Sequence, residues 1–101
     1  MFFLMQCHHH ADKAPDHHTH RPAHREWVGL GGNGLASVLI GSAMRDENGH
    51  GNFGILETTT KADAHAFAQG DPINRHGIVR EISLIRLADG FQHQRIDRMI
   101  P

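Results

Sequence analysis

The chain has 101 residues and a formal net charge of −1, with acidic and basic side chains interspersed along it. This length fits a single domain over residues 1–101, and the charge provides no broad basic field for nucleic acid. No stretch approaches the roughly 20 apolar residues of a membrane span, so we expect a cytoplasmic protein with neither nucleic acid nor a membrane as partner.

A buried strand is predicted over Phe2–Cys7, a compact apolar run bounded by polar residues. Cys7 is the lone cysteine, so it forms no internal disulfide, and we expect its thiol to be buried rather than reactive. The following segment, His8–His20, is dominated by His, Asp, Lys and Pro and has no apolar period. It is therefore predicted to be a loop.

A helix is predicted to begin at Pro22 and to end near Leu30. Proline suits the first helical position, because its missing N–H is not needed there. Ala23, Trp27 and Leu30 recur at helical spacing and form one apolar stripe. The glycines that follow make continuation of the helix costly.

Two strands and a second helix are predicted next. Leu35–Ile40 and Phe53–Thr58 are rich in apolar and β-branched residues, and residues 45–52 between them have the composition of an exposed hairpin connection. Thr60 opens a capping-box pattern ahead of a helix that runs to Gln69. The two strands are therefore expected to be antiparallel neighbours.

A last strand is predicted over Ile78–Leu87, and residues 91–101 form a C-terminal tail whose apolar content favours packing. The order βαββαβ predicts a ferredoxin-like α+β fold with an antiparallel sheet. Two helices would cover one face of this sheet and leave the other apolar and exposed. We therefore expect a homodimer that closes the second face.

Two patterns suggest cofactors but lack the right context. Residues 29–34 match G-x-G-x-x-G, yet here the glycines close a helix instead of opening one, so no dinucleotide site is predicted. Metal binding is suggested by the histidines that crowd one region, His8, His9, His10, His17, His18, His20 and His24. No HExxH motif or cysteine pair accompanies them. We predict neither a cofactor nor a resident metal, and keep a histidine-rich metal-binding protein as an alternative.

His24 and Asp71 form the candidate functional pair. His24 falls in the first turn of the predicted helix, where the helix dipole disfavours imidazolium and leaves a ring that can accept a proton. Asp71 lies in the turn before Pro72, at the sheet edge that the start of the first helix could also border. A carboxylate there would orient the imidazole, as acids paired with histidine bases do. Each residue also has a purely structural interpretation, as a helix surface residue and a turn residue.

Four short patterns in order resemble the YciI-like (YCII-related) family: Arg21-Pro22-Ala23-His24, Leu39-Ile40-Gly41, Gly70-Asp71-Pro72 and Gly77-Ile78-Val79. The resemblance spans about Met1 to Leu87 and implies a dimeric α+β barrel with a His–Asp pair in a cleft. It places the family histidine at His24, the aspartate at Asp71 and a basic residue at Arg21. Ser42 stands where the family commonly has proline. Members characterised as enzymes act on small ring compounds, among them a chlorinated hydroxyquinol.

The leading hypothesis is an acid–base enzyme acting on a small metabolite. His24 would transfer the proton, Asp71 would orient it, and Arg21 and Ser42 would hold a polar or anionic molecule. The reaction would be a proton abstraction, an isomerisation or an elimination of the dehydrochlorinase type. A non-catalytic ligand-binding or accessory dimer is the alternative from another class.

Overall fold

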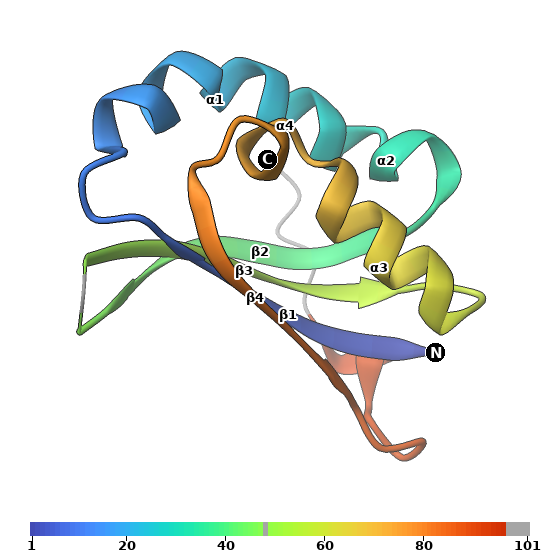
Figure 1. Ribbon diagram of the computed structural model, residues 1–101. Helices are drawn as coiled ribbons and strands as arrows, with labels where there is room; N and C mark the ends of the chain where they lie inside the picture. Colours follow the sequence, from blue (N-terminus) through green and yellow to red (C-terminus); the bar gives the residue numbers. More distant parts are fainter. Residues whose placement is uncertain (48, 97–101) are drawn as a thin grey trace.

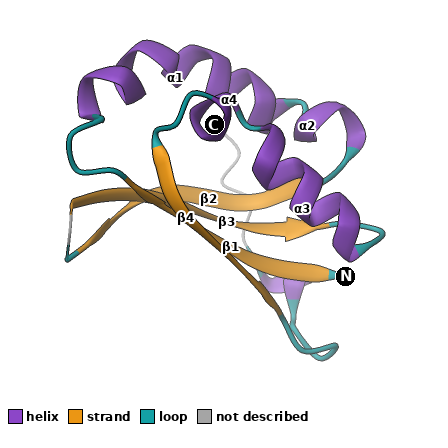
Figure 2. Cartoon of the chain, in the orientation of Figure 1, coloured by secondary structure: helices purple, strands orange, loops and turns teal. Residues whose placement is uncertain are grey.

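One antiparallel sheet organises the part of the chain that the computed structural model describes, residues 1–47 and 49–96. Its strands lie in the order β2-β3-β1-β4, and all the α-helices cover one face (Figures 1 and 2). The elements are β1 Phe2–His9, α1 Ala14–Gly29, α2 Gly31–Gly34, β2 Ser37–Asp46, β3 Gly49–Glu57, α3 Lys61–Gly70, α4 Pro72–Arg75, β4 Val79–Arg86 and the 3-10 turn η1 His93–Arg95. The predicted ferredoxin-like α+β fold is confirmed. No helix within the described ranges is long and apolar enough to cross a membrane.

The predicted first strand is present and continues to His9. Its odd-numbered residues, Phe3, Met5, Cys7 and His9, are buried, and its even-numbered residues are only partly buried. This alternation follows from the pleat, which points successive side chains to opposite faces of a sheet. The largest fully buried side chains are Phe3, Leu56, Phe67, Ile73 and Ile78. The core therefore lies between the sheet and the helices.

The first helix begins earlier than predicted. The sequence predicted a loop over His8–His20 and a helix from Pro22, whereas α1 begins at Ala14 and Pro22 lies inside it. Pro15 occupies the first turn, where a proline costs little. The prediction was wrong because it relied on an apolar period, and α1 has no fully buried residue to provide one.

The hairpin of β2 and β3 is longer than predicted. Strands were predicted over Leu35–Ile40 and Phe53–Thr58, with residues 45–52 as their connection. In the structure, β2 continues to Asp46 and β3 already begins at Gly49, and these two residues pair. Backbone pairing does not depend on side-chain polarity. The prediction from composition therefore assigned two exposed strand ends to a loop.

Asp71 lies in the turn between α3 and α4. The Oγ1 of Thr60 accepts a hydrogen bond from the N–H of Asp63 at 3.1 Å and caps α3. The helix ends at Gly70, and Asp71 is extended (φ −60°, ψ 131°), as residues before proline prefer. Its Oδ1 accepts the N–H of Ile73 at 3.1 Å and caps α4. One carboxylate oxygen thus anchors the turn, which leaves Oδ2 for a different partner.

The glycine-rich segment 29–34 is a helix-to-strand turn, as predicted. The short element α2 is not an ordinary helix, because Gly32 and Asn33 both have φ of 63°. Gly32 also lies against two rings: a Cβ on it would come within 2.8 Å of Trp27 and 2.9 Å of Phe67. Glycine is required at this position both for the left-handed backbone and for space.

Replacing Gly32 with alanine is expected to lower the free energy of unfolding by about 2–4 kcal/mol, because backbone strain and overpacking add. Gly34 is the matched control: its φ is 95° but a Cβ there would meet nothing within 4 Å. Gly34→Ala should cost only the backbone strain, about 1–2 kcal/mol. Urea unfolding followed by Trp27 fluorescence measures both, and equal losses would contradict the packing argument.

The described part of the C-terminal tail packs against β1. The ring of Phe2 meets Phe91 edge-on, with centroids 5.5 Å apart, and stacks on His93 at 4.5 Å. The expected packing is thus observed for Phe91 and His93. The remainder of the tail, residues 97–101, lies outside the described residues.

Candidate functional site

A cavity of about 360 Å³ lies between α1 and the strands β2 and β3. Its floor contains residues with small or no side chains, Gly41, Ala43 and Gly54. Gly41 pairs with Gly54, and Gly54 pairs with Met5 on β1, so two glycines lie side by side in neighbouring strands. Glycines in strands allow other groups to approach the backbone closely. This floor explains why there is room beneath α1.

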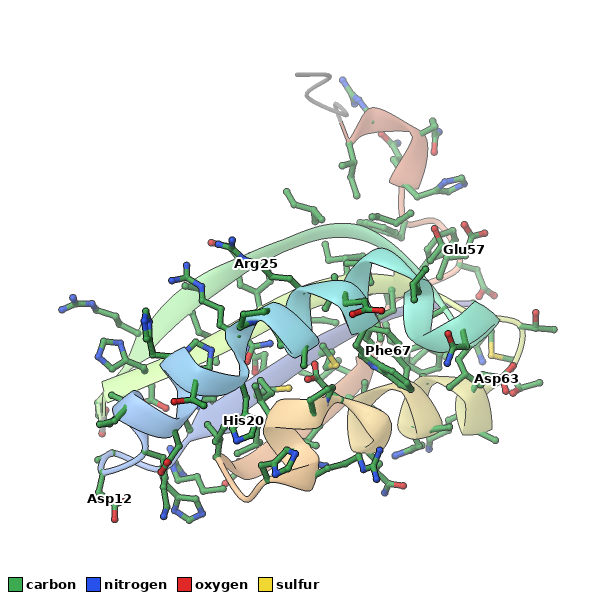
Figure 3. The ribbon with its side chains drawn as sticks, turned by 90° about the horizontal axis from the view of Figure 1, so that it is seen from above. Asp12, His20, Arg25, Glu57, Asp63 and Phe67 are labelled. Carbon is green, nitrogen blue, oxygen red and sulfur yellow. The ribbon has the colours of Figure 1, made fainter. Side chains whose placement is uncertain are left out.

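The helix α1 forms the opposite wall of the cavity. Residues three, four and seven positions apart share one face of a helix. Figure 3 shows α1 crossing the sheet, with Arg25 on the β2 side and Phe67 between α1 and α3. The residues that α1 contributes to the cavity are His17, Arg21, His24, Arg25 and Val28.

His24 and Asp71 meet beside this cavity. The Nδ1 atom of His24 lies 2.7 Å from the Oδ2 atom of Asp71, although the two residues are 47 positions apart. Asp71 is only 4% exposed, and its Oδ1 is already engaged by the N–H of Ile73. The carboxylate is therefore fixed at both oxygens. Because Nδ1 is engaged by Asp71, Nε2 is the ring nitrogen that His24 can offer to a molecule in the cavity.

The position of His24 along α1 differs from the prediction. It was expected in the first turn of a helix, where the dipole would keep the imidazole neutral. Since α1 begins at Ala14, His24 lies well beyond the first turn, and the dipole effect has faded there. The argument from the helix dipole was wrong. The orientation of the ring comes from Asp71 instead.

Two histidines that were not predicted as site residues, His9 and His17, form a row of neighbouring rings with His24. The ring centroid of His17 lies 4.9 Å from that of His9 and 6.4 Å from that of His24. His9 Nε2 lies 2.7 Å from the Oδ1 of Asn52. Burial lowers the pKa of His9, and burial together with nearby His9, His24 and Arg21 lowers the pKa of His17. Both rings are therefore neutral near pH 7.

A spacing of seven residues puts His17 and His24 on one helix face, which was a usable signal for His17. This spacing indicates a shared face only if both residues lie on the same helix. Because a loop was predicted over His8–His20, His17 was not placed on the helix that carries His24.

The predicted ligand-binding residues differ in how they meet the cavity. Arg21 lines it, and so does Arg25, which was not predicted. Ser42 also borders it, but strand alternation places the Ser42 side chain on the face opposite to that of Gly41 and Ala43, and its hydroxyl donates to the Ala43 carbonyl at 2.9 Å. Ser42 therefore meets the cavity mainly through its backbone.

The charged side chains that line the cavity are basic. Of the described residues, the lining includes two arginines and two histidines but no carboxylate, and Asp71 reaches it only through His24. Among the described residues, no group of three or more His, Cys, Asp or Glu side chains is arranged to hold a metal ion. The arrangement is suited to proton transfer on a negatively charged or strongly polar small molecule.

No protein-family model matches the chain, and no curated protein does so. Among solved structures, the chain is similar to 5-chloro-2-hydroxyhydroquinone dehydrochlorinase (TftG) from Burkholderia phenoliruptrix AC1100, solved in complex with 2,5-dihydroxybenzoquinone. The TM-score is 0.74 at 18% sequence identity, and the match covers 89% of this chain and 96% of the other. At this identity the likeness shows a shared fold.

Proposed function

We propose that this chain is a YciI-like enzyme that moves protons on a small anionic ring compound bound beneath α1. The observation that carries the proposal is the hydrogen bond of 2.7 Å between His24 and the buried Asp71 at the edge of the cavity. A histidine held in this way by a carboxylate is the usual form of a general base.

Asp71 positions the base and His24 carries out the transfer. The carboxylate keeps the proton of neutral His24 on Nδ1, so Nε2 presents its lone pair to the ligand. Nε2 then takes a proton from the ring compound, and Asp71 stabilises the imidazolium that forms. The electron pair left on the ligand either expels a leaving group from a neighbouring carbon or is protonated at a new position. Positioned transfer of this kind typically contributes about 10²- to 10⁴-fold in rate.

A small, flat anion fits the cavity best. Its volume of about 360 Å³ falls at the lower end of the range for small-molecule sites, and Val28, Val38 and Phe67 supply apolar walls. Arg21 and Arg25 supply positive charge beside these walls. The structurally similar dehydrochlorinase acts on a chlorinated hydroxyhydroquinone and binds a dihydroxybenzoquinone, both small oxygenated rings. This likeness supports a ring compound as substrate here.

Covalent catalysis by the only cysteine does not fit the site. Cys7 is buried on β1, and burial, with a smaller effect of the Asp71 carboxylate, raises the pKa of its thiol to about 12. A thiol in this state provides almost no thiolate near neutral pH. The proposal therefore uses acid–base chemistry alone.

A panel of ring compounds tests the function: hydroquinone, 2,5-dihydroxybenzoate and 5-chloro-2-hydroxyhydroquinone. Ultraviolet–visible spectra and chloride release would report turnover, and we expect it for at least one oxygenated ring. NMR detection of His24 would run in parallel. Binding without turnover, with a His24 titration that no bound ring alters, would favour a non-catalytic ligand-binding protein and refute the enzyme.

We further propose that two copies of the chain pack through the sheet face opposite α1 to α4. Four apolar side chains form one row on this face, since Ile40 pairs with Ile55, Ile55 with Leu4, and Leu4 with Ile85. Ile40 is 45% exposed and Ile85 is 50% exposed. Figure 1 shows this face below the sheet, with α1 to α4 all on the other side. A small domain gains most by covering such a row with a second copy.

Replacing Ile85 with arginine is expected to convert the dimer to monomer, because the substitution would bury an unpaired charge in the apolar row that the two copies cover. The dissociation constant should rise by about 100-fold or more. Sedimentation velocity at micromolar concentration measures the change, and Ala66→Arg, on the exposed side of α3, is the matched control. A wild-type chain that sediments as a monomer would refute the proposed dimer.

A further inference from the structure

A second pocket, of about 190 Å³, opens next to the cavity that holds His24. It lies where the end of β1, the start of α1 and the start of β3 come together, at the end of the molecule that carries the β2–β3 hairpin (Figure 1). We call it the histidine pocket, after its lining residues His9, His10, Ala14, His17, His18, Arg21 and His50. Ala14 is the sole apolar residue among these seven.

The lining of the histidine pocket offers positive charge and N–H donors. Arg21 is permanently protonated, and imidazole rings donate one N–H when neutral and two when protonated. Within residues 1–47 and 49–96, no carboxylate belongs to the lining. The nearby Asp16 is paired with Lys13 at 3.8 Å, and Asp46 with His8 and Arg80. The local chemistry therefore favours an anion.

A transition-metal ion fits the same pocket less well. Metal ligation needs several imidazole nitrogens converging on one point, and no such group of three exists among the residues that the structure describes. His9, the most buried ring of the pocket, already has its Nε2 atom engaged by Asn52 at 2.7 Å. The guanidinium of Arg21 in the same wall would repel a cation. The histidine pocket is therefore better suited to an anion than to a metal ion.

The histidine pocket adjoins the main cavity. His17 and Arg21 line both spaces. A ring held beneath α1 can therefore extend a substituent past these two side chains. The volume of the histidine pocket is several times the roughly 30 Å³ share of one water molecule, which is enough for a carboxylate or a tetrahedral oxyanion.

We propose that the histidine pocket binds an oxyanion, either a free inorganic anion or the carboxylate, sulfate or phosphate group of the molecule held in the main cavity. The second source rests on the proposed function, whereas the first does not. The anion would be contacted from α1 by Arg21, His17 and His18, and from β3 by His50. His9 is the most buried residue of the pocket, and Asn52 holds its ring by the contact described above.

Sulfate is the probe, because its charge stays the same across the pH range of the test. Titration followed by NMR at constant ionic strength should shift the signals of His17, His18 and His50. The double variant His18→Gln/His50→Gln should weaken sulfate binding by roughly tenfold, since charge-assisted hydrogen bonds are lost. His65→Gln, on the exposed surface of α3, should bind like the wild type. Equal affinity in both variants would overturn the proposal.

Two further measurements separate the possible ligands. As the pH falls from about 7.5 to about 6, sulfate binding should persist, because protonation of an imidazole removes no N–H donor. Zinc ions should bind more weakly over the same range because protons compete for the same nitrogens. Stoichiometric zinc binding that depends on His18 and His50, with no sulfate binding, would overturn the proposal.

The two anion sources are distinguished by competition. If the anion belongs to the ring compound, 2,5-dihydroxybenzoate will compete with sulfate and hydroquinone will not. If the anion is free, neither ring will compete. The variant His24→Gln should retain sulfate binding, because His24 does not line the histidine pocket. An inactive enzyme that still binds sulfate would thus refute the proposed function and leave the oxyanion site standing.

Discussion

If the proposed function holds, replacing His24 with glutamine will lower kcat by about 10²- to 10⁴-fold on any ring compound that the protein turns over. Glutamine can keep a hydrogen bond to the buried Asp71 carboxylate, so the fold should survive. It has no group that can accept a proton near neutral pH. Steady-state kinetics across the panel measure the loss, and since we propose that Arg21 and Arg25 hold the ring compound, KM should change much less than kcat.

The control for this variant is His65→Gln, which changes the same side chain at an exposed site on α3. It should retain full kcat. Circular dichroism and urea unfolding would establish that both variants are folded. A His24→Gln enzyme with wild-type kcat would remove His24 from the mechanism and leave the cavity as a binding site.

Replacing Asp71 with asparagine is expected to lower kcat to a comparable degree, although the change affects a residue that does not touch the substrate. The amide oxygen can still accept the N–H of Ile73, but the amide N–H₂ would now donate to the Nδ1 atom of His24. The proton of the neutral ring would then lie on Nε2, and the base would lose its lone pair toward the cavity. We expect a loss in kcat of about 10²- to 10⁴-fold.

A structural role for Asp71 predicts a different result. If the carboxylate served only to cap α4, Asp71→Asn would keep both the cap and the activity, and Asp71→Ala would lower the free energy of unfolding by about 1–2 kcal/mol. Nitrogen chemical shifts of the His24 ring report the tautomer directly. A His24 ring that keeps its proton on Nδ1 in the Asp71→Asn variant would contradict the positioning role.

The local features of the site followed from sequence because neighbouring residues determine them. The apolar opening segment predicted a buried strand, and its pleat explains the buried odd-numbered residues. Thr60 capped the helix that it was predicted to cap. The Asp71-Pro72 pair predicted an extended turn after Gly70, because proline restricts the residue before it.

The boundaries of α1 and of the β2–β3 hairpin required the tertiary structure. An amphipathic helix is recognised in a sequence by the apolar period of the residues that it buries, and α1 has no fully buried residue. The histidine-rich start of the helix therefore resembles a loop in sequence. Likewise, the ends of β2 and β3 are strands because they pair with one another, and polar side chains do not prevent that pairing.

The sequence by itself predicted the βαββαβ order of the strands and longer helices, since caps, turns and apolar alternation act over a few residues. Together with the family resemblance, it nominated His24 and Asp71. Only the tertiary structure brought these two side chains together across 47 positions and added His17, Arg25 and Asn52 to the cavity. It also turned the Ser42 side chain to the other face of β2. The physical reason is that a cavity exists where one helix crosses the small side chains of two strands, and helix packing on a sheet is not encoded in any short segment.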